Sequence, residues 1–419
     1  LRLSRQSRLT PTFPGSAWER EEREDTRNKS REGRHEKNYP NVVNFHQPSH
    51  GLLNVRVSGD KRWPMEWWRE SPQMNMRRNI FETCVIFGGT GFIGTHFAAH
   101  LLTNKLTERV VLADVRLSPR EAWPLPLQEA TARGQVRTIQ IDVRQPILHG
   151  ELPNHADRVV NLAAVHREPG HEAYEYFATN LPGAEYVCAW AEQVRCPWII
   201  FTSSIAPYGP TEEERDENSL PVPISPYGAS KLAAEKIHLG WQRAGQGRRL
   251  TIVRPGVVFG PGEGGNVSRM IKAVLGRYFP YMGNRATRKA GGYVKELCQA
   301  LAWVMQWQVE NGKETTLFNF TMDPAPTVEE YVNAICRVAG VERFVPSIPY
   351  ALVLGASYPI EAICRPLGIH QPFSPVRVRK LVRSNNIAPR FLREHGYPYR
   401  YTLEQALADW RREKPEEWT

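Results

Sequence analysis

Short apolar runs alternate with longer segments of helical periodicity from residue 81 onward. The runs have the length of buried strands, and the segments between them repeat apolar residues every three or four positions, as amphipathic helices do. This alternation predicts an α/β fold, a doubly wound parallel sheet with helices on both faces. The predicted strands are 85–87, 110–113, 138–141, 159–162, 198–202 and 250–253.

The pattern loosens after residue 260. A helix is predicted at 267–275, a further strand at 317–321, and another helix after Thr327, which has the spacing of a capping box to Glu330. We therefore expect a main Rossmann-type domain at 76–260. Residues 261–419 should form mainly a smaller C-terminal substrate-binding lobe with a helical tail.

Residues 1–75 differ from the rest of the chain. They are rich in Arg, Glu, Ser, Asn and Pro and lack sustained hydrophobic periodicity, which is typical of disordered segments. They have neither the apolar core of a signal peptide nor the acid-poor composition of a transit peptide. We therefore expect a disordered extension. Because the chain begins with Leu1 and not with Met, the alternative is a chain start assigned upstream of a natural start at Met74 or Met76.

The most apolar stretch of the C-terminal region covers residues 350–363. It is shorter than the roughly 20 apolar residues that a membrane-spanning helix needs, and Pro359 and Glu361 interrupt it. The sequence therefore predicts a buried helix and no stable membrane insertion.

Charge and cysteine content exclude some classes of protein. The net charge is +10, but the basic residues are spread among many acids, so we expect no nucleic-acid partner. The densest basic run after residue 75, at 377–383, is interpreted as a solvated helix face, with a binding patch as the alternative. Six cysteines without a CxxC pair or zinc-type histidine spacing predict a reducing, cytoplasmic location and no metal.

A glycine-rich turn follows the first predicted strand. Gly88 can adopt backbone angles closed to other residues, Gly91 lets the backbone approach a pyrophosphate, and Gly94 lets the next helix pack closely. The start of that helix offers free N–H groups to phosphates. Asp114 ends the second strand twenty residues after Gly94, where a Rossmann-type fold places the carboxylate that accepts ribose hydroxyls. The small residues Ala163 and Ala164 follow the fourth strand, where a cofactor could lie across the sheet.

Tyr227 and Lys231 carry the strongest catalytic signal. They are four residues apart at the start of a predicted helix and therefore share one face of it. A nearby ammonium stabilises a phenolate, so the pair could exchange protons near neutral pH. Ser203 or Ser204, at the end of the fifth strand, could hold the reacting oxygen.

The chain from about 81 to 330 resembles an extended short-chain dehydrogenase/reductase of the NAD-dependent epimerase/dehydratase family. The resemblance rests on the glycine turn, Asp114, 142–143, 161–164, Asn180, 202–204, the Tyr227 and Lys231 pair, and 254–255. It implies Ser204, Tyr227 and Lys231 as the catalytic set and NAD as the cofactor, because the Asp114 carboxylate would repel the 2′-phosphate of NADP. It implies these cofactor contacts: Gly88, Thr90, Gly91, Phe92, Ile93, Gly94, Asp114, Asp142, Val143, Ala163, Ala164, Asn180, Tyr227 and Lys231.

The residues after the catalytic hydroxyl distinguish chemistries within this family. Dehydratases and decarboxylating members carry carboxylates there, whereas this chain has Ile205 and Ala206. The resemblance thus favours a nucleoside-diphosphate-sugar epimerase, acting at C4 of a UDP-hexose or N-acetylhexosamine through a transient ketone. A dehydrogenase or ketoreductase of a hydroxysteroid-like alcohol or keto sugar is the alternative, since the tail beyond 340 is similar to that branch. The intact Tyr227 and Lys231 argue against a third possibility, a dinucleotide sensor without catalysis.

Substrate contacts depart from the family pattern. Val257 stands where sugar-nucleotide members usually have an Asn near the substrate diphosphate. Arg269, Arg288 and Lys289 are candidate phosphate contacts, and surface charges are the simpler interpretation of each. Ser203 and Ser204 are expected to contact the substrate as well, and a homodimer is possible because helices beside such sheets often pair.

Overall fold

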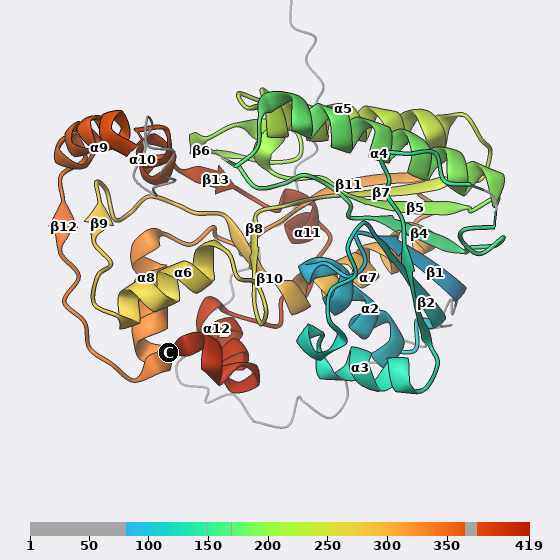
Figure 1. Ribbon diagram of the computed structural model, residues 1–419, viewed down its shortest axis with the longest axis horizontal. Helices are drawn as coiled ribbons and strands as arrows, with labels where there is room; N and C mark the ends of the chain where they lie inside the picture. The colour runs from blue at the N-terminus through green and yellow to red at the C-terminus, as the bar shows by residue number, and fades with distance from the viewer. Residues whose placement is uncertain (1–80, 149, 169, 365–374) are drawn as a thin grey trace, which may run out of the picture. The chain divides into compact units, whose positions relative to one another are not determined.

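The computed structural model of the chain describes residues 81–148, 150–168, 170–364 and 375–419 (Figure 1). The extension predicted at 1–75 lies outside these residues. A seven-stranded sheet forms the centre of the unit from residue 74 to 419. In spatial order its strands are β11 (Thr315–Phe320), β7 (Arg249–Pro255), β5 (Trp198–Thr202), β4 (Arg158–Asn161), β1 (Phe81–Phe87), β2 (Thr107–Asp114) and β3 (Val136–Gln140).

All neighbouring strands of this sheet are parallel. The seven strands predicted from the sequence are all present, with shifts of a few residues at their ends, and the doubly wound parallel fold is confirmed. The strand order reverses direction between β1 and β4. In such sheets the ligand crevice lies at this switch point, outside the carboxyl ends of the strands.

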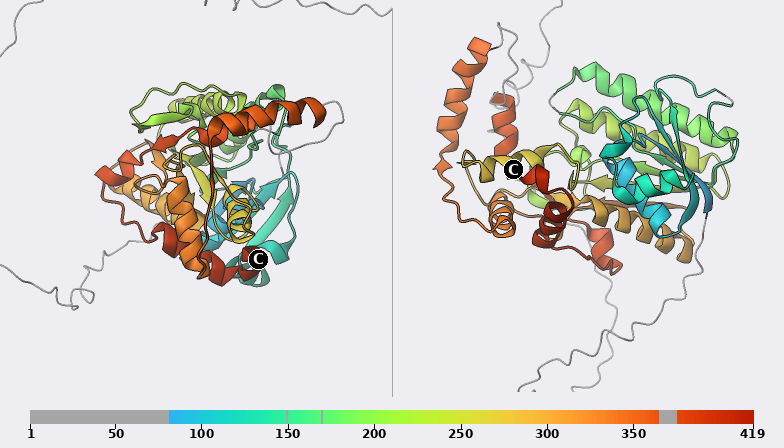
Figure 2. Two further views of the ribbon diagram at one scale, coloured as in Figure 1. Left: turned by 90° about the vertical axis from the view of Figure 1, so that its left-hand side faces the viewer. Right: turned by 60° about the horizontal axis from the view of Figure 1, so that its bottom comes forward.

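Helices cover both faces of the sheet (Figures 1 and 2). Cys84 and Ile86 of β1 belong to one core and Val85 and Phe87 to the other, as the alternation of side chains along a strand requires. The first core contains residues of α2 (Phe92–Thr103), α3 (Leu125–Ala132) and α7 (Val294–Glu310), and the second contains residues of α4 (Ala173–Gln193) and α5 (Pro226–Arg243). Because both faces are covered, the inner strands carry runs of consecutive buried apolar residues, such as 84–87 of β1 and 198–201 of β5.

A third core lies among the C-terminal helices α6 (Asn266–Leu275), α8 (Val328–Ala339) and α12 (Leu403–Glu413). The predicted capping box at Thr327 and Glu330 starts α8. β11 and α7 follow residue 260 in the sequence and yet belong to the sheet layers. The division into domains at residue 260 stays a prediction.

Three pairs of short strands form two-stranded sheets of their own. β6 (Thr211–Arg215) pairs with β13 (Asn385–Ile387), β8 (Val257–Phe259) with β10 (Gly291–Tyr293), and β9 (Tyr281–Met282) with β12 (Ser347–Ile348). The remaining elements are η1 (Arg120–Ala122), η2 (Ala206–Tyr208), α9 (Tyr350–Cys364), α10 (Pro375–Val382), α11 (Arg390–Glu394) and η3 (Pro415–Trp418).

The prediction that the helix at 350–363 is buried is wrong. The segment does form a helix, α9, but only Ser357 of that helix is buried. Apolar composition indicates that a segment can be buried and does not say whether the fold supplies something to cover it. Among the described residues, no helix is both long and apolar enough to cross a bilayer.

Candidate active site

The glycine turn after β1 has the geometry expected from its sequence. Gly88 has a φ of +71°, which favours glycine, and a Cβ there would lie 2.8 Å from the backbone nitrogen of Ala163. A Cβ on Gly94 would lie 2.6 Å from the carbonyl oxygens of both Gly88 and Gly89. The turn is therefore held so close to the β4 loop and to α2 that side chains are excluded.

The start of α2 points into this turn. Gly91 is its N-cap, and no side chain caps the helix. Asp114 lies beside it, accepting hydrogen bonds from the backbone N–H of Thr90 at 3.1 Å and of Arg116 at 3.4 Å. The uncapped N–H groups and a fixed carboxylate form the pattern that suits a pyrophosphate and its ribose.

A small hollow of about 170 Å³ borders the turn. Thr90, Gly91 and Phe92 line it on one side, and Glu413 and Lys414 line it from the C-terminal segment. The local glycine motif gave no indication that the last residues of the chain would reach this edge.

Asp142 and Val143 follow β3, with different surroundings. The Asp142 carboxylate binds the Arg144 guanidinium through both oxygens, and the hydrogen bond from that side chain holds its pKa below the usual value. Val143 is buried, and a Cβ on Gly183 of α4 would lie 3.1 Å from it. Val143 thus packs against α4, whereas Asp142 is at the surface edge.

Asn180 of α4 joins the loop after β4 to α5. Its amide oxygen accepts from the N–H of Val165 at 2.9 Å, and its amide nitrogen donates to the carbonyl of Val165 and to the hydroxyl of Ser230. Ser230 lies directly before Lys231, so Asn180 fixes the spacing between the Ala163 and Ala164 loop and the catalytic helix.

Two buried polar atoms at the carboxyl ends of the central strands lack a partner within the described ranges. They are Oδ1 of Asn161, which ends β4, and Oγ1 of Thr202, which ends β5. A buried polar atom without a partner is costly unless a ligand or water completes it. Together with the glycine turn and Asp114, these atoms fit a polar cofactor lying across this edge.

Ser203 and Ser204 face different groups although they are neighbours. The Ser203 hydroxyl is buried and donates to Glu235 at 2.5 Å. Glu235 in turn holds Arg254 in a buried ion pair with distances of 2.6 and 2.8 Å. The Ser204 hydroxyl instead accepts from the Ala206 N–H at 3.1 Å and hydrogen-bonds Tyr227. Of the two serines, Ser204 is the one that the structure brings to Tyr227.

Burial shifts the pKa values of Tyr227 and Lys231 in opposite directions. Burial raises the pKa of the Tyr227 phenol to about 12, and the hydrogen bond with Ser204 partly offsets this. Burial lowers the pKa of the Lys231 ammonium to about 7, although the Glu235 charge acts to raise it. The ammonium lies 4.4 Å from the centre of the Phe201 ring. Burial thus favours the neutral form of both groups, and strongly shifted pKa values of this kind are typical of functional sites.

Three further groups around Tyr227 and Lys231 could not be found from local sequence motifs. Glu168 accepts a hydrogen bond at 3.1 Å from Ser225, the N-cap of α5, and its charge acts to raise the Tyr227 pKa. The Tyr176 ring lies 5.9 Å from the Tyr227 ring. His238 stacks on Phe201 at 4.0 Å, and burial lowers its pKa to about 4. Each comes from a different part of the chain, so no local motif could predict the set.

The three basic candidates for phosphate binding are held in different ways. Arg269 lies exposed on α6 and donates to Asn266 at 2.6 Å. Arg288 donates to the carbonyl of Ala325 at 2.6 Å, and Lys289 donates to that of Arg383 at 2.6 Å. Burial lowers the pKa of Lys289 to about 8, against the nearby charge of Glu212. The structure places Arg288 and Lys289 in one backbone segment and Arg269 on a separate helix.

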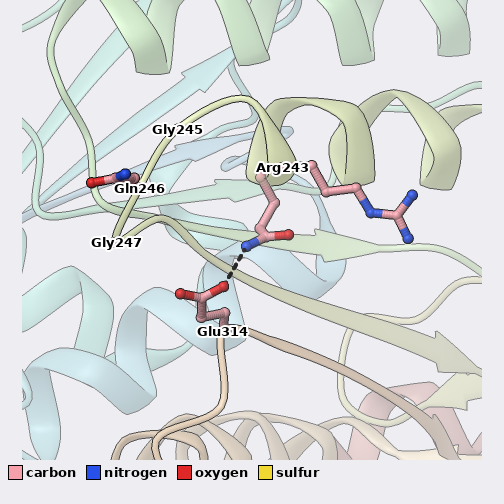
Figure 3. Close-up of a pocket in the computed structure, with 6 residues that line it drawn as sticks. Arg243, Gly245, Gln246, Gly247 and Glu314 are labelled. Carbon is pink, nitrogen blue, oxygen red and sulfur yellow. Dashed lines mark hydrogen bonds between the residues drawn. The ribbon is translucent and has the colours of Figure 1, made fainter.

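A larger hollow lies at the opposite edge of the sheet (Figure 3). Its lining residues come from the end of α5, the loop before β7 and the residue before β11. The Gln242 amide donates a hydrogen bond of 3.3 Å to Glu314 across it. Ser204 follows the carboxyl end of β5 and hydrogen-bonds Tyr227, so the candidate catalytic groups lie at the other edge and this hollow is not the candidate active site.

Comparison with known proteins agrees with the arrangement at the carboxyl edge. Residues 84–319 match the model of the NAD dependent epimerase/dehydratase family. The chain belongs to this family. It is accordingly an NAD-dependent enzyme of the extended short-chain dehydrogenase type, and NAD is its cofactor.

Two curated members of the family illustrate its range. N-acetyl-alpha-D-glucosaminyl-diphospho-ditrans,octacis-undecaprenol 4-epimerase from Escherichia coli O157:H7 is 29% identical over 329 residues, which are 78% of this chain and 93% of that protein. UDP-glucose 4-epimerase from Neisseria gonorrhoeae is 26% identical over 346 residues, covering 78% of this chain and 96% of that protein.

A solved structure in the family supports the fold. UDP-N-acetylglucosamine 4-epimerase from Methanobrevibacter ruminantium M1, solved in complex with UDP-N-acetylmuramic acid, superposes with a TM-score of 0.62 at 20% identity. The match covers 80% of this chain and 99% of that one.

Proposed function

We propose that this family member is a 4-epimerase of a nucleoside-diphosphate sugar, acting on a UDP-hexose or UDP-N-acetylhexosamine through a transient keto sugar. The observation that carries the proposal is the placement of Ser204 against Tyr227, one helical turn before Lys231, at the carboxyl edge of the sheet. Two relatives are named 4-epimerases, and this chain matches 93% and 96% of their lengths. Their names support the choice of reaction.

NAD would be held by the glycine turn and the strand ends. The N–H groups at the start of α2 face the pyrophosphate position, and the Asp114 carboxylate suits the hydroxyls of the adenosine ribose. Lys231 is proposed to bind the nicotinamide ribose. When bound, NAD supplies the acceptance and return of one hydride.

Tyr227 is proposed to move the proton of the sugar hydroxyl. With a pKa near 12 it holds its own proton at neutral pH, so a neighbouring positive charge is needed before it can act as a base. Lys231 supplies such a charge when it is protonated, and Ser204 would hold the reacting oxygen within reach of the phenol. In the reverse step Tyr227 returns the proton to the oxygen of the keto sugar.

The residues after Ser204 argue for epimerisation over loss of water. The next two residues are Ile205, which is buried, and Ala206, which begins η2. Both side chains are hydrocarbons, so neither supplies the carboxylate that expulsion of a hydroxyl group needs. Inversion at C4 requires the keto sugar to turn over between the two half-reactions. The site must therefore hold the diphosphate more firmly than the sugar ring.

Arg288 and Lys289 are the proposed diphosphate contacts, with Arg269 as a further candidate. Burial lowers the pKa of Lys289 because it removes water from the charged ammonium. A bound phosphate would stabilise that charged form. The Lys289 ammonium donates to the backbone carbonyl of Arg383, and a hydrogen bond to a phosphate would be stronger than that one because both groups would be charged.

Incubation of the purified protein and NAD with UDP-glucose and UDP-N-acetylglucosamine in separate reactions tests the proposal. NMR should detect the C4 epimer of at least one sugar, without a stoichiometric change in absorbance at the wavelength of reduced nicotinamide. Net reduction of the cofactor in proportion to product would instead indicate a dehydrogenase. Absence of any interconversion would exclude these sugars as substrates.

A further inference from the structure

Helix α9 is apolar and largely exposed. Among its 15 residues, Tyr350–Cys364, Glu361 is the only one with a formal charge, and Ser357 is the only buried residue. Leu352 and Ile363 are each 65% exposed. A surface helix of a soluble domain normally turns charged residues toward water, so this helix has the opposite arrangement.

The exposed residues form one continuous face. Leu352, Ala356, Pro359 and Ile363 recur at the spacings of successive helical turns, and all four are exposed. The helix is about 22 Å long, so the face extends over roughly four turns. The Ser357 hydroxyl on the opposite side donates to the carbonyl of Leu354 within the helix. The exposed face therefore presents no charged group.

The neighbouring helix α10 supplies positive charge. It packs beside α9, and Arg379 donates to the Tyr358 hydroxyl at 2.8 Å (Figure 1). Arg379 and Arg383 are exposed. The sequence of residues 375–383 has four basic residues and no acidic one. The second view of Figure 2 shows the two helices standing side by side beyond β9 and β12.

We propose that the exposed face of α9 docks on the surface of an anionic lipid bilayer. An apolar helix face beside basic residues is the combination that binds in the interface of such membranes, with the apolar residues among the acyl chains and the cations among the headgroups. Because residues 375–383 beside this face carry four positive charges and no negative one, the surface is complementary to an anionic headgroup layer. The helix lies on the bilayer and does not cross it.

This location would suit a sugar diphosphate carried by a lipid. The 4-epimerase of Escherichia coli O157:H7, 29% identical, is named for a substrate of that kind. β13 follows α10 and pairs with β6, and Lys289 contacts the carbonyl of Arg383 between α10 and β13. The docking helices are thus connected, through the Lys289 side chain and the backbone bridge between Lys289 and Asn385, to the segment proposed to bind the diphosphate, and this last link rests on the proposed function.

Flotation of the full chain with vesicles tests the docking surface. The vesicles contain phosphatidylcholine and phosphatidylglycerol in a ratio of about seven to three, with pure phosphatidylcholine as the uncharged comparison. The test variant combines Leu352→Glu and Ile363→Glu. The control is Leu148→Glu, a residue that is 62% exposed in a loop after β3, outside α9 and α10.

The protein should float with the anionic vesicles, and the double variant should partition at least about tenfold more weakly because charge replaces apolar contact. The control should match the wild type within about twofold, and neutral vesicles should bind several-fold less protein. Equal flotation of the double variant and the wild type, or no flotation of the wild type, would overturn the proposal. The assay contains no sugar, so its failure leaves the epimerase proposal untouched.

Two other occupants of the face give distinct results. If a second copy covers α9, sedimentation velocity will show a dimer that the double variant dissociates, and vesicles will not compete with it. If another segment of the chain covers α9, hydrogen exchange at 350–364 will be slow before vesicles are added and unchanged afterwards. Either result would replace the membrane proposal.

Discussion

The glycine turn after β1 and the segment at Arg288 and Lys289 both lie beside strands, but they are held in place by different means. In the turn, neighbouring backbone packs so closely on Gly88 and Gly94 that an added Cβ would lie only 2.6 to 2.8 Å from its atoms. At Arg288 and Lys289 the backbone is bridged to Thr327 and Asn385, and side chains reach residues 37 and 94 positions away. The first site can be recognised from the residue types alone, whereas the second depends on partners far along the chain.

This difference predicts separable effects of mutation. Changes at the carboxyl edge of β1 to β5 should alter the chemical step or NAD binding. Changes at 288–289 should alter the substrate KM and leave NAD binding alone.

The Tyr227→Phe variant should show the largest effect. Loss of the proton-transferring hydroxyl should lower kcat by about 10²- to 10⁴-fold. NAD affinity, measured by calorimetry, should change by no more than about twofold because the ring remains in place. Tyr278→Phe is the matched control, since Tyr278 is 68% exposed on the surface. Full activity in the Tyr227→Phe variant would contradict the proposed mechanism.

The Gly94→Ala variant should weaken NAD binding by at least about tenfold. Its methyl group would meet two backbone carbonyl oxygens at 2.6 Å, so the turn or α2 must shift. Gly240→Ala is the control, because Gly240 lies within α5 with nothing within 4 Å of its added Cβ. That variant should gain about 0.5–1 kcal/mol in free energy of unfolding and keep its NAD affinity. Equal NAD affinity in the two variants would show that the turn is more tolerant than its geometry indicates.

The Lys289→Met variant should raise the KM of the UDP-sugar by about tenfold, the cost of one charge-assisted hydrogen bond. Its NAD affinity should equal that of the wild type. Lys313→Met, at an exposed turn after α7, serves as the control. A loss of NAD binding without a change in KM would place Lys289 in the cofactor site and break the separation of the two regions.

The smallest effect concerns stability and pH in the absence of NAD. The Lys231 pKa falls from 10.5 to about 7 on folding, so the unfolded chain binds the extra proton between those values. Stability should therefore rise with pH across this window. Relative to the wild type, Lys231→Met should be most stabilised near about pH 6.5, and the difference should shrink by about pH 9.5. Chemical denaturation at several pH values measures this, and a pH-independent difference would show that the ammonium is not desolvated.

The sequence determined the parts of this protein that depend on neighbours in the chain. The strand positions could be predicted from short apolar runs, because a parallel strand with helices on both faces buries the side chains of both faces. The turn followed from Gly88 and Gly94, whose backbone geometry excludes other residues. The Tyr227 and Lys231 pair followed from helical spacing.

Tertiary structure decided which of these groups meet and what surrounds them. It turned Ser203 toward Glu235 and Ser204 toward Tyr227, although the sequence presented both hydroxyls at the end of one strand. It left α9 exposed although its composition favoured burial. The physical reason is the same in both cases: the energy of a hydroxyl or an apolar helix depends on its partners, and those partners come from distant segments that local periodicity does not specify.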